Sequence, residues 1–289
     1  MISAVVSSRV HAPAVSRRVV RQLSSSSFVS PRPIRPLRRL ANESSDSSAL
    51  LRLVVRAGWN DVSFAPAKIT SNKAVTSSPV LNRLLVDVGA EATSKYTIAG
   101  QFVQVKMSEE GKAGFFAIAS APDANNAGVI ELLVKASGDP AEAICASGEG
   151  TGVLVSDVMG KGFPVDRIAG VGNVYIFCTG SGISPIKALI ESGTLDAGSR
   201  NVTLYYGAKN KEAMAYADLF GAWENAGVEV VPVFSETGVY VQEAFKNDGG
   251  VRDAGASCAI LCGQKEMAEA VKSIFADAGV AEDLVLTNF

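Results

Sequence analysis

The chain has 289 residues, of which 47% are hydrophobic and 19% are charged, with 27 basic and 29 acidic side chains. This profile is typical of a soluble globular protein with a buried core, and the length suits one large domain or two ordinary ones. The single histidine, His11, lies in a basic N-terminal segment, so the rest of the chain is excluded from Ser-His-Asp catalysis, Cys-His catalysis and histidine metal sites.

The first 40 residues contain eight arginines and nine serines but no lysine or acidic residue. This composition is typical of an organelle transit peptide. Arginine and proline interrupt its short apolar pieces, so it predicts neither a secretory signal nor a membrane span. We predict a transit peptide over residues 1–56, with the chloroplast as destination and the mitochondrion as the alternative. A basic arm that binds nucleic acid is a competing interpretation.

Removal of residues 1–56 would take away ten basic and two acidic residues, which leaves 17 basic against 27 acidic ones and a net charge near −10. Such a charge disfavours nucleic acid and anionic membranes as partners, and it would repel an acidic electron carrier unless basic residues cluster locally. The cysteines form no Cys-x-x-Cys pair, so we expect free thiols and neither a zinc nor an iron–sulfur site. They are Cys145, Cys178, Cys258 and Cys262.

The chain from Phe64 to Ser156 reads as short apolar runs separated by glycine, proline, aspartate and asparagine. Evenly spaced short strands of this kind predict a small antiparallel β-barrel, which we place at residues 57–168. The expected strands are 67–71, 81–88, 100–106, 115–120, 129–135 and 152–156. The segment 159–172 is rich in glycine and suits a domain boundary.

The chain after residue 169 alternates between strands and helices. The expected strands are 174–178, 202–206, 228–234, 259–262 and 284–286, with helices from Pro185 and over about 211–225, 241–246 and 265–277. This order predicts an α/β domain with a five-stranded parallel sheet over residues 169–289, and it places ligands at the carboxyl ends of the strands.

The first of these strands ends in the turn Gly180-Ser-Gly-Ile-Ser-Pro185. Glycines allow a tight turn beside a ligand, while Ser184 suits a helix N-cap and Pro185 the first helical position. The free N–H groups of such a helix favour a pyrophosphate. An ordinary strand-to-helix turn is the alternative, because Pro185 replaces the third glycine of G-x-G-x-x-G and no acidic residue ends the next strand.

Taken together, the ordered motifs match a known family. They are Gly100-Gln-Phe-Val, Ile118-Ala-Ser, Gly180-Ser-Gly-Ile-Ser-Pro, Tyr206-Gly-Ala-Lys, Gly238-Val-Tyr-Val-Gln242 and Cys262-Gly-Gln. Over about residues 64–289 the chain resembles the ferredoxin–NADP reductase superfamily, and most closely its plastid members of the kiwifruit fruit-protein type. The resemblance implies FAD on the barrel, a nicotinamide nucleotide, NAD(P)H, on the second domain, and hydride transfer between them.

For the second domain, the resemblance implies three groups of site residues. Gly180, Ser181, Gly182, Ser184 and Pro185 match the pyrophosphate turn. Lys209 would meet a phosphate or ribose, or else be a solvated loop lysine. Tyr240 and Gln242 match positions at the adenosine, although a tyrosine covering the sheet edge is the alternative for Tyr240. Cys262 matches a cysteine beside the nicotinamide, with Gly263 allowing close backbone approach; a buried apolar cysteine is the competing interpretation.

Nucleotide selectivity follows from charge. Where NADP-specific relatives carry an arginine, this chain has Ser235-Glu236. A carboxylate would repel a 2′-phosphate, so we expect NADH to be accepted at least as well as NADPH.

The barrel departs from the family's flavin signature Arg-x-Tyr-Ser, which aligns with Gly114-Phe-Phe-Ala117. Loss of an arginine–phosphate contact would cost about 1.5–3 kcal/mol, or about tenfold to a hundredfold in affinity. Phe116 still offers a flat ring for stacking, although an apolar strand core explains the segment equally. A second phosphate motif, Gly-x-x-Ser, appears as Gly138-Asp-Pro-Ala141. The remaining positions that the resemblance places at the flavin are Ala117, Ile118, Ala119, Ser120, Val134 and Lys135, with Phe289 as a terminal aromatic over the ring unless that end is frayed.

These observations support one leading hypothesis, a flavin-dependent NAD(P)H oxidoreductase that passes electrons to an unidentified acceptor, with an electron-acceptor protein as a possible partner. A flavin-free NAD(P)-binding module with a docking or regulatory role is the alternative, and an electron-transfer subunit of a larger enzyme is a third. No general base is needed, because the cofactor carries the chemistry and the protein positions it.

Overall fold

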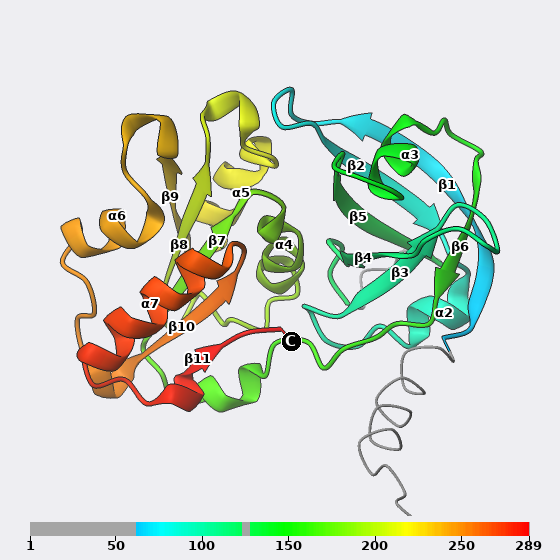
Figure 1. Cartoon of the computed structure of the whole chain (residues 1–289). Helices are drawn as coiled ribbons and strands as arrows, with labels where there is room; N and C mark the ends of the chain where they lie inside the picture. Colours follow the sequence, from blue (N-terminus) through cyan, green and yellow to red (C-terminus); the bar gives the residue numbers. More distant parts are fainter. Residues whose placement is uncertain (1–61, 123–127, 289) are drawn as a thin grey trace, which may run out of the picture. The chain divides into compact units, whose positions relative to one another are not determined.

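The structure is a computed structural model, and it describes residues 62–122 and 128–288. These residues belong to one compact unit of the chain and build two sheets, one of six strands and one of five (Figure 1). The expected transit peptide, 1–56, and the candidate site residue Phe289 lie outside the described residues. No helix within the described ranges is long and apolar enough to cross a membrane.

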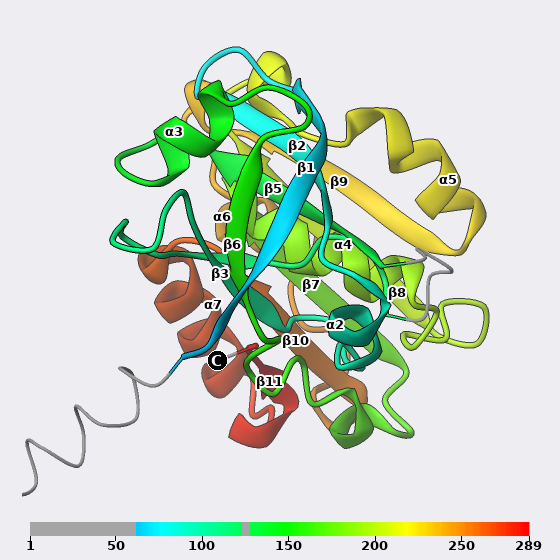
Figure 2. The same cartoon turned by 90° about the vertical axis from the view of Figure 1, so that its right-hand side faces the viewer.

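The first sheet is entirely antiparallel and runs in the order β4-β3-β6-β1-β2-β5. Its strands are β1 (Phe64–Ala74), β2 (Leu81–Asp87), β3 (Phe102–Lys106), β4 (Gly114–Ala117), β5 (Val129–Lys135) and β6 (Gly152–Ser156), with the short helices α2 (Ala90–Ser94) and α3 (Ala141–Ala146) between them. A bridge between Ile118 and Leu132 brings the two outer strands together, so the sheet curls into a nearly closed barrel. Figure 2 views this barrel with β1 and β6 in front. The predicted barrel is therefore confirmed.

The second sheet is entirely parallel, in the order β11-β10-β7-β8-β9. Its strands are β7 (Asn173–Thr179), β8 (Asn201–Ala208), β9 (Val228–Phe234), β10 (Ser257–Cys262) and β11 (Val285–Leu286), and its helices are α4 (Ile183–Glu191), α5 (Phe220–Asn225), α6 (Val241–Asn247) and α7 (Lys265–Asp277). The predicted α/β architecture is confirmed.

Side-chain alternation along β7 explains why helices cover both faces of this sheet. Val174 and Ile176 point into the core that contains residues of α4 and α5. Tyr175 and Phe177 point to the opposite face, where they pack with residues of α6 and α7 such as Phe245. A strand with apolar residues on both faces has to be covered on both.

The order of the strands fixes where a ligand can enter. From the central strand β7 the chain moves outward to β8 and β9, and then returns to β10 on the other side of β7. The connections that follow β7 and β10 therefore diverge, which leaves a crevice at the carboxyl ends of these two strands.

Two details differ from the prediction. Helix α4 begins at Ile183 with Gly182 as its N-cap, after a 3-10 turn over Gly180–Gly182, so the assignment of Ser184 as N-cap was wrong. The Ser184 hydroxyl instead donates a hydrogen bond to the carbonyl of Ala117 in the barrel, at 2.9 Å. Contact with another domain thus outweighs local capping.

The single helix expected over 211–225 was also wrong. The segment forms 3-10 turns at Lys211–Ala213 and Ala217–Leu219, and α5 starts only at Phe220. The helix is interrupted because Tyr216 adopts a left-handed backbone with φ of 61°, which a continuing α-helix does not accommodate. This turn directs the Tyr216 hydroxyl toward Glu131 of the barrel, at 2.7 Å.

Candidate functional site

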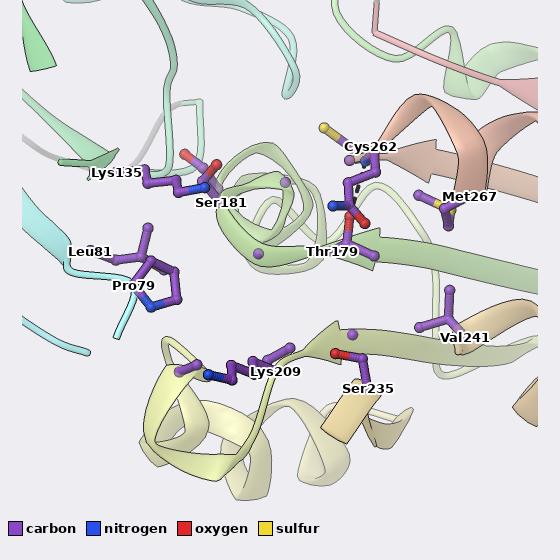
Figure 3. Close-up of a pocket in the computed structure, with 18 of the residues that line it drawn as sticks. Pro79, Leu81, Lys135, Thr179, Ser181, Lys209, Ser235, Val241, Cys262 and Met267 are labelled. Atoms are coloured by element: carbon purple, nitrogen blue, oxygen red, sulfur yellow. Dashed lines mark hydrogen bonds between the residues drawn. The ribbon is translucent and has the colours of Figure 1, made fainter. Parts of the chain in front are cut away.

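A cleft of about 1250 Å³ lies at the carboxyl end of the parallel sheet, and residues of the barrel and of the α/β domain both line it. Figure 3 shows Pro79, Leu81 and Lys135 of the barrel together with Thr179 and Cys262 at the ends of β7 and β10. The cleft is therefore placed where the strand order leaves its crevice.

The floor of the cleft is formed by the turn after β7. Gly182 approaches the end of β10 so closely that a Cβ atom on it would overlap the carbonyl oxygen of Cys262. Since the obstacle is backbone, it cannot move aside as a flexible side chain would. Glycine at this position therefore lets the turn and the end of β10 form one continuous surface.

A glycine is also required just after the end of β10, at Gly263. A Cβ atom on Gly263, whose φ is 152°, would overlap the hydroxyl of Thr179. That hydroxyl accepts a hydrogen bond from the backbone N–H of Gln264 at 3.0 Å. The last residue of β7 thus orients the loop after β10, and both loops present backbone to the cleft.

The facing wall, contributed by the barrel, is apolar. Its lining residues are Pro79, Leu81, Phe115, Phe116, Ala117 and Leu133. The Phe116 ring packs against the barrel core, and Phe115 is 53% exposed and contacts Phe102 with ring centroids 5.9 Å apart. A flat apolar group could be buried between this wall and the glycine turn.

Helix α4 bonds directly to the barrel strand that carries these aromatic residues. Ser184 donates to the Ala117 carbonyl, and the Lys187 ammonium donates to the Ala119 carbonyl at 3.3 Å. Both acceptors are main-chain atoms at or just beyond the end of β4. The helix that follows the glycine turn is therefore held at a fixed distance from the apolar wall.

Behind this contact lies a buried carboxylate, Glu131 of β5, which is 4% exposed. It accepts hydrogen bonds from Arg83 and Tyr216, each at 2.7 Å, and its carboxylate lies 3.6 Å from the Lys187 ammonium. Burial and the neighbouring Glu131 charge raise the pKa of Tyr216, which keeps that phenol a neutral donor. Lys187 also pairs with Glu191 at 2.7 Å. We call this set the interdomain cluster: Arg83, Glu131, Lys187, Glu191 and Tyr216.

Two further loops close the cleft on the side of β8 and β9. Lys209 follows β8 and Ser235 follows β9, and both line the cleft (Figure 3). The Lys209 carbonyl accepts from the backbone N–H of Glu236 at 3.0 Å, which ties the two loops together. Tyr240, 52% exposed, and Gln242 complete this side.

The comparisons with known proteins agree with this geometry. The family profile described as oxidoreductase NAD-binding domain matches residues 176–273. The chain is 31% identical over 227 residues to the fruit protein pKIWI502 of Actinidia deliciosa, and the match covers 72% of each protein. The chain belongs to the same family as this fruit protein.

Solved structures of ferredoxin–NADP+ reductases share the fold. The ferredoxin NADP+ reductase of Neisseria gonorrhoeae, with bound FAD and NADP, superimposes with a TM-score of 0.66 at 20% identity and covers 78% of this chain and 97% of its own. The ferredoxin-NADP+ reductase of Plasmodium falciparum gives a TM-score of 0.61 at 20% identity, covering 74% of this chain and 89% of its own. These likenesses show the two-domain fold.

Most of the residues that the superfamily resemblance singled out meet in the cleft. Those that line it are Phe116, Ala117, Lys135, Ala141, Gly180, Ser181, Gly182, Ser184, Pro185, Lys209, Tyr240, Gln242, Cys262 and Gly263. Their spacing in sequence is wide, and the convergence is produced by the fold. Their individual roles stay predictions.

Five residues from the same set do not line the cleft. Ile118, Ala119 and Val134 are buried, and the Ser120 hydroxyl accepts from the backbone N–H of Glu131 at 3.1 Å. Gly138 lies in an exposed turn. The first four support the cleft from behind, while Gly138 lies beside it.

Sequence reasoning missed other lining residues. Among them are Thr179, Met267, Pro79 and Leu81. The rule that ligands meet the carboxyl ends of parallel strands could have found Thr179, because it is the last residue of β7. No sequence signal pointed to Pro79 and Leu81, which the fold brings to the cleft from the loop after β1 and the start of β2.

The residues present can be tested against FAD and NADP, which are bound in the Neisseria gonorrhoeae structure. The glycine turn brings its main chain and the positive end of α4 to the cleft, an arrangement that suits a nucleotide pyrophosphate. The apolar wall fits a flavin ring. The flavin's phosphates fit poorly, because Gly114 has no side chain and, among the described residues of the barrel, Lys135 is the one cation that lines the cleft.

Cys262 lines the cleft but is mostly surrounded by protein atoms. This burial raises the pKa of its thiol to about 12. We therefore expect it to stay protonated and to react slowly with iodoacetamide. Labelling at about pH 8 should be about a thousandfold slower than for a thiol of ordinary pKa near 9, as only the thiolate reacts. Mass spectrometry of the Cys262 peptide across pH would check this, and a rate that levels off near pH 9 would contradict it.

Proposed function

We propose that this protein is a flavin-dependent NAD(P)H oxidoreductase, in which a nicotinamide nucleotide on the α/β domain delivers a hydride to a flavin ring on the barrel. One observation carries the proposal: a single cleft is lined on one side by the glycine turn and the end of β10, and on the other by the aromatic wall of β4. A donor and an acceptor bound on these two sides would face each other.

On the nucleotide side, the backbone does most of the binding. The main chain of the turn Gly180–Gly182 would hold the pyrophosphate, whose charge the positive end of α4 favours. Lys209, Tyr240 and Gln242 would hold the adenosine half. Cys262 and Gly263 would then lie beside the nicotinamide ring, where the neutral thiol adds no competing charge.

On the barrel side, the chain supplies shape and exclusion of water. A flavin bound there supplies the two-electron chemistry. Phe116 and Ala117 would support the ring, and Leu81 and Leu133 would keep solvent from its edge. No general base is required for a hydride transfer, so positioning by these side chains is the contribution we assign to the protein.

The test is spectroscopic. Full-length protein supplied with flavin is mixed anaerobically with NADH, and we expect the visible flavin absorption to bleach at a rate that saturates with NADH. NADH affinity is measured separately from the change in protein fluorescence. Protein that binds NADH but leaves every added flavin oxidised would contradict the proposal.

We expect kcat/KM for NADH to equal or exceed that for NADPH. Glu236 is exposed in the loop that is bonded to Lys209, where its carboxylate would repel a 2′-phosphate. The substitution Glu236→Arg should raise the NADPH-to-NADH ratio by about tenfold or more, equivalent to about 1.4 kcal/mol. Steady-state kinetics with both nucleotides checks this, and Glu282→Arg, at an exposed residue outside the cleft lining, is the matched control. A wild-type ratio that strongly favours NADPH would refute it.

The finer assignments are also part of the proposal. We assign residues 1–56 to a transit peptide, 57–168 to the barrel domain and 169–289 to the α/β domain, with the chloroplast as the location. The arginine- and serine-rich first 40 residues support the targeting. A fusion of residues 1–60 to a fluorescent protein tests it, and accumulation in mitochondria would favour the alternative. The final acceptor of the electrons is proposed to be a separate protein.

A further inference from the structure

The flavin side of the cleft carries fewer charged side chains than the nucleotide side. Its lining is aromatic and aliphatic apart from Ser137 and one cation, Lys135 at the end of β5. A dinucleotide such as FAD carries a pyrophosphate that needs several donors or cations, whereas an isoalloxazine ring needs a flat apolar surface. The wall therefore favours the ring of a flavin over its phosphates.

The turn at Gly138, beside this wall, has a backbone N–H group that is already hydrogen-bonded within the protein. The backbone N–H of Gly138 donates to the Glu142 carboxylate at 2.9 Å. Asp139, exposed in the same turn, adds a second acidic group. A phosphate placed here would displace a carboxylate from the N–H group and meet negative charge, and both effects oppose binding.

Strand β4, which also borders the wall, cannot supply a cation for a pyrophosphate. At Gly114, a Cβ atom would lie 2.7 Å from the Phe116 ring and 3.1 Å from Pro140. The ring and the proline therefore fill the space that a long side chain from β4 would need. Within residues 114–122 and 128–142, Lys135 is therefore the one cation that lines the cleft, too few for a pyrophosphate but enough for a single phosphate.

We propose that flavin is an exchangeable substrate of this protein, held by its ring, and that riboflavin is bound more tightly than FAD. The inference rests on the proposed function and specifies which flavin the protein binds best. NAD(P)H, oxidised flavin and a proton give NAD(P)+ and dihydroflavin: the nicotinamide C4–H bond breaks, its hydride carries two electrons to form an N–H bond on the flavin ring, and solvent supplies the proton. The dihydroflavin then leaves the cleft and carries the electrons to the acceptor.

The experiment uses dialysed full-length protein and three probes: riboflavin, FMN and FAD. Quenching of flavin fluorescence gives each dissociation constant, and we expect the value for riboflavin to be at least tenfold lower than that for FAD, with FMN between them because Lys135 can meet one phosphate. Dialysis should leave the protein colourless. NADH oxidation should depend on added flavin in the same order of preference.

Two variants locate the effect. Phe116→Ala should weaken all three flavins by at least tenfold, because each relies on the ring surface. Glu142→Gln should strengthen FAD and FMN by several-fold while riboflavin is unchanged, because only the phosphates meet that charge. Glu149→Gln, at an exposed carboxylate that does not line the cleft, is the matched control and should change none of them.

The outcomes separate this inference from the proposed function. FAD retained through dialysis at about one per chain, or FAD bound more tightly than riboflavin, would overturn the inference and leave the proposed function standing. Absence of binding by every flavin, with NADH still bound, would overturn both. Preferential binding of riboflavin without any binding of NADH would support the inference and overturn the proposed function.

Discussion

Replacement of Glu131 by alanine is expected to lower the free energy of unfolding by about 3–5 kcal/mol, the cost of removing one partner from a buried ion pair. Without this carboxylate, the buried Lys187 ammonium keeps only Glu191, and the Arg83 and Tyr216 donors lose their acceptor. Denaturant unfolding followed by tryptophan fluorescence is a suitable measurement, because one of the two tryptophans, Trp223, donates to Glu191 at 3.4 Å.

Two controls show whether burial is the cause. Glu269→Ala removes an exposed pair with Lys265, whose side chains are 64% and 82% exposed, and should cost less than about 0.5 kcal/mol. The double substitution Glu131→Leu with Lys187→Met removes both charges of the buried pair and should recover the part of the loss that is due to the unpaired Lys187, while Arg83 and Tyr216 still lack their acceptor. A Glu131→Ala protein that unfolds within about 1 kcal/mol of wild type would show that the interdomain cluster contributes little.

Replacement of Gly182 by valine is expected to weaken NADH binding by at least a hundredfold, about 2.7 kcal/mol. Its Cβ atom would overlap the Cys262 carbonyl oxygen and lie 3.0 Å from the Gly263 Cα, so the turn after β7 would have to move away from β10. That movement would carry the main chain of the turn and the positive end of α4 out of position. Fluorescence titration with NADH gives the affinity, and near-ultraviolet circular dichroism reports whether the fold survives.

Smaller changes make this result interpretable. Gly182→Ala adds one methyl group and should already weaken NADH binding, while Gly198→Ala, at a glycine with no atom within 4 Å of the added Cβ, should leave affinity and stability close to wild type. If a folded Gly182→Val protein bound NADH with unchanged affinity, the turn could not be the nucleotide site. The proposed function would then lose its central observation.

The sequence predicted the architecture well because its signals are local. Short apolar runs bounded by glycine and proline coincide with the observed strands, and β7 and β9 lie within one residue of their expected bounds. The ordered motifs predicted the superfamily. Local signals failed where another domain competes for a group: Ser184 bonds to Ala117 instead of capping α4, and Tyr216 turns toward Glu131 and interrupts the expected helix.

The interdomain cluster could not be predicted in the same way. Glu131 and Tyr216 are 85 residues apart, and their contact depends on the packing of one domain against the other. One signal was present, because Glu131 stands in the otherwise apolar run Val129-Ile-Glu-Leu-Leu-Val134. An acidic residue in a buried strand requires partners, although the sequence does not name them.

The bonds from α4 to the barrel have a consequence for redesign. Ser184 and Lys187 bond to the main-chain carbonyls of residues 117 and 119, so these contacts do not depend on the side chains that β4 carries. Substitutions at Phe115 and Phe116 can therefore alter what the wall accepts while both bonds to α4 are kept. Libraries confined to these two positions should yield folded variants that prefer other flavins or flat apolar ligands at the wall. The glycine turn need not be changed.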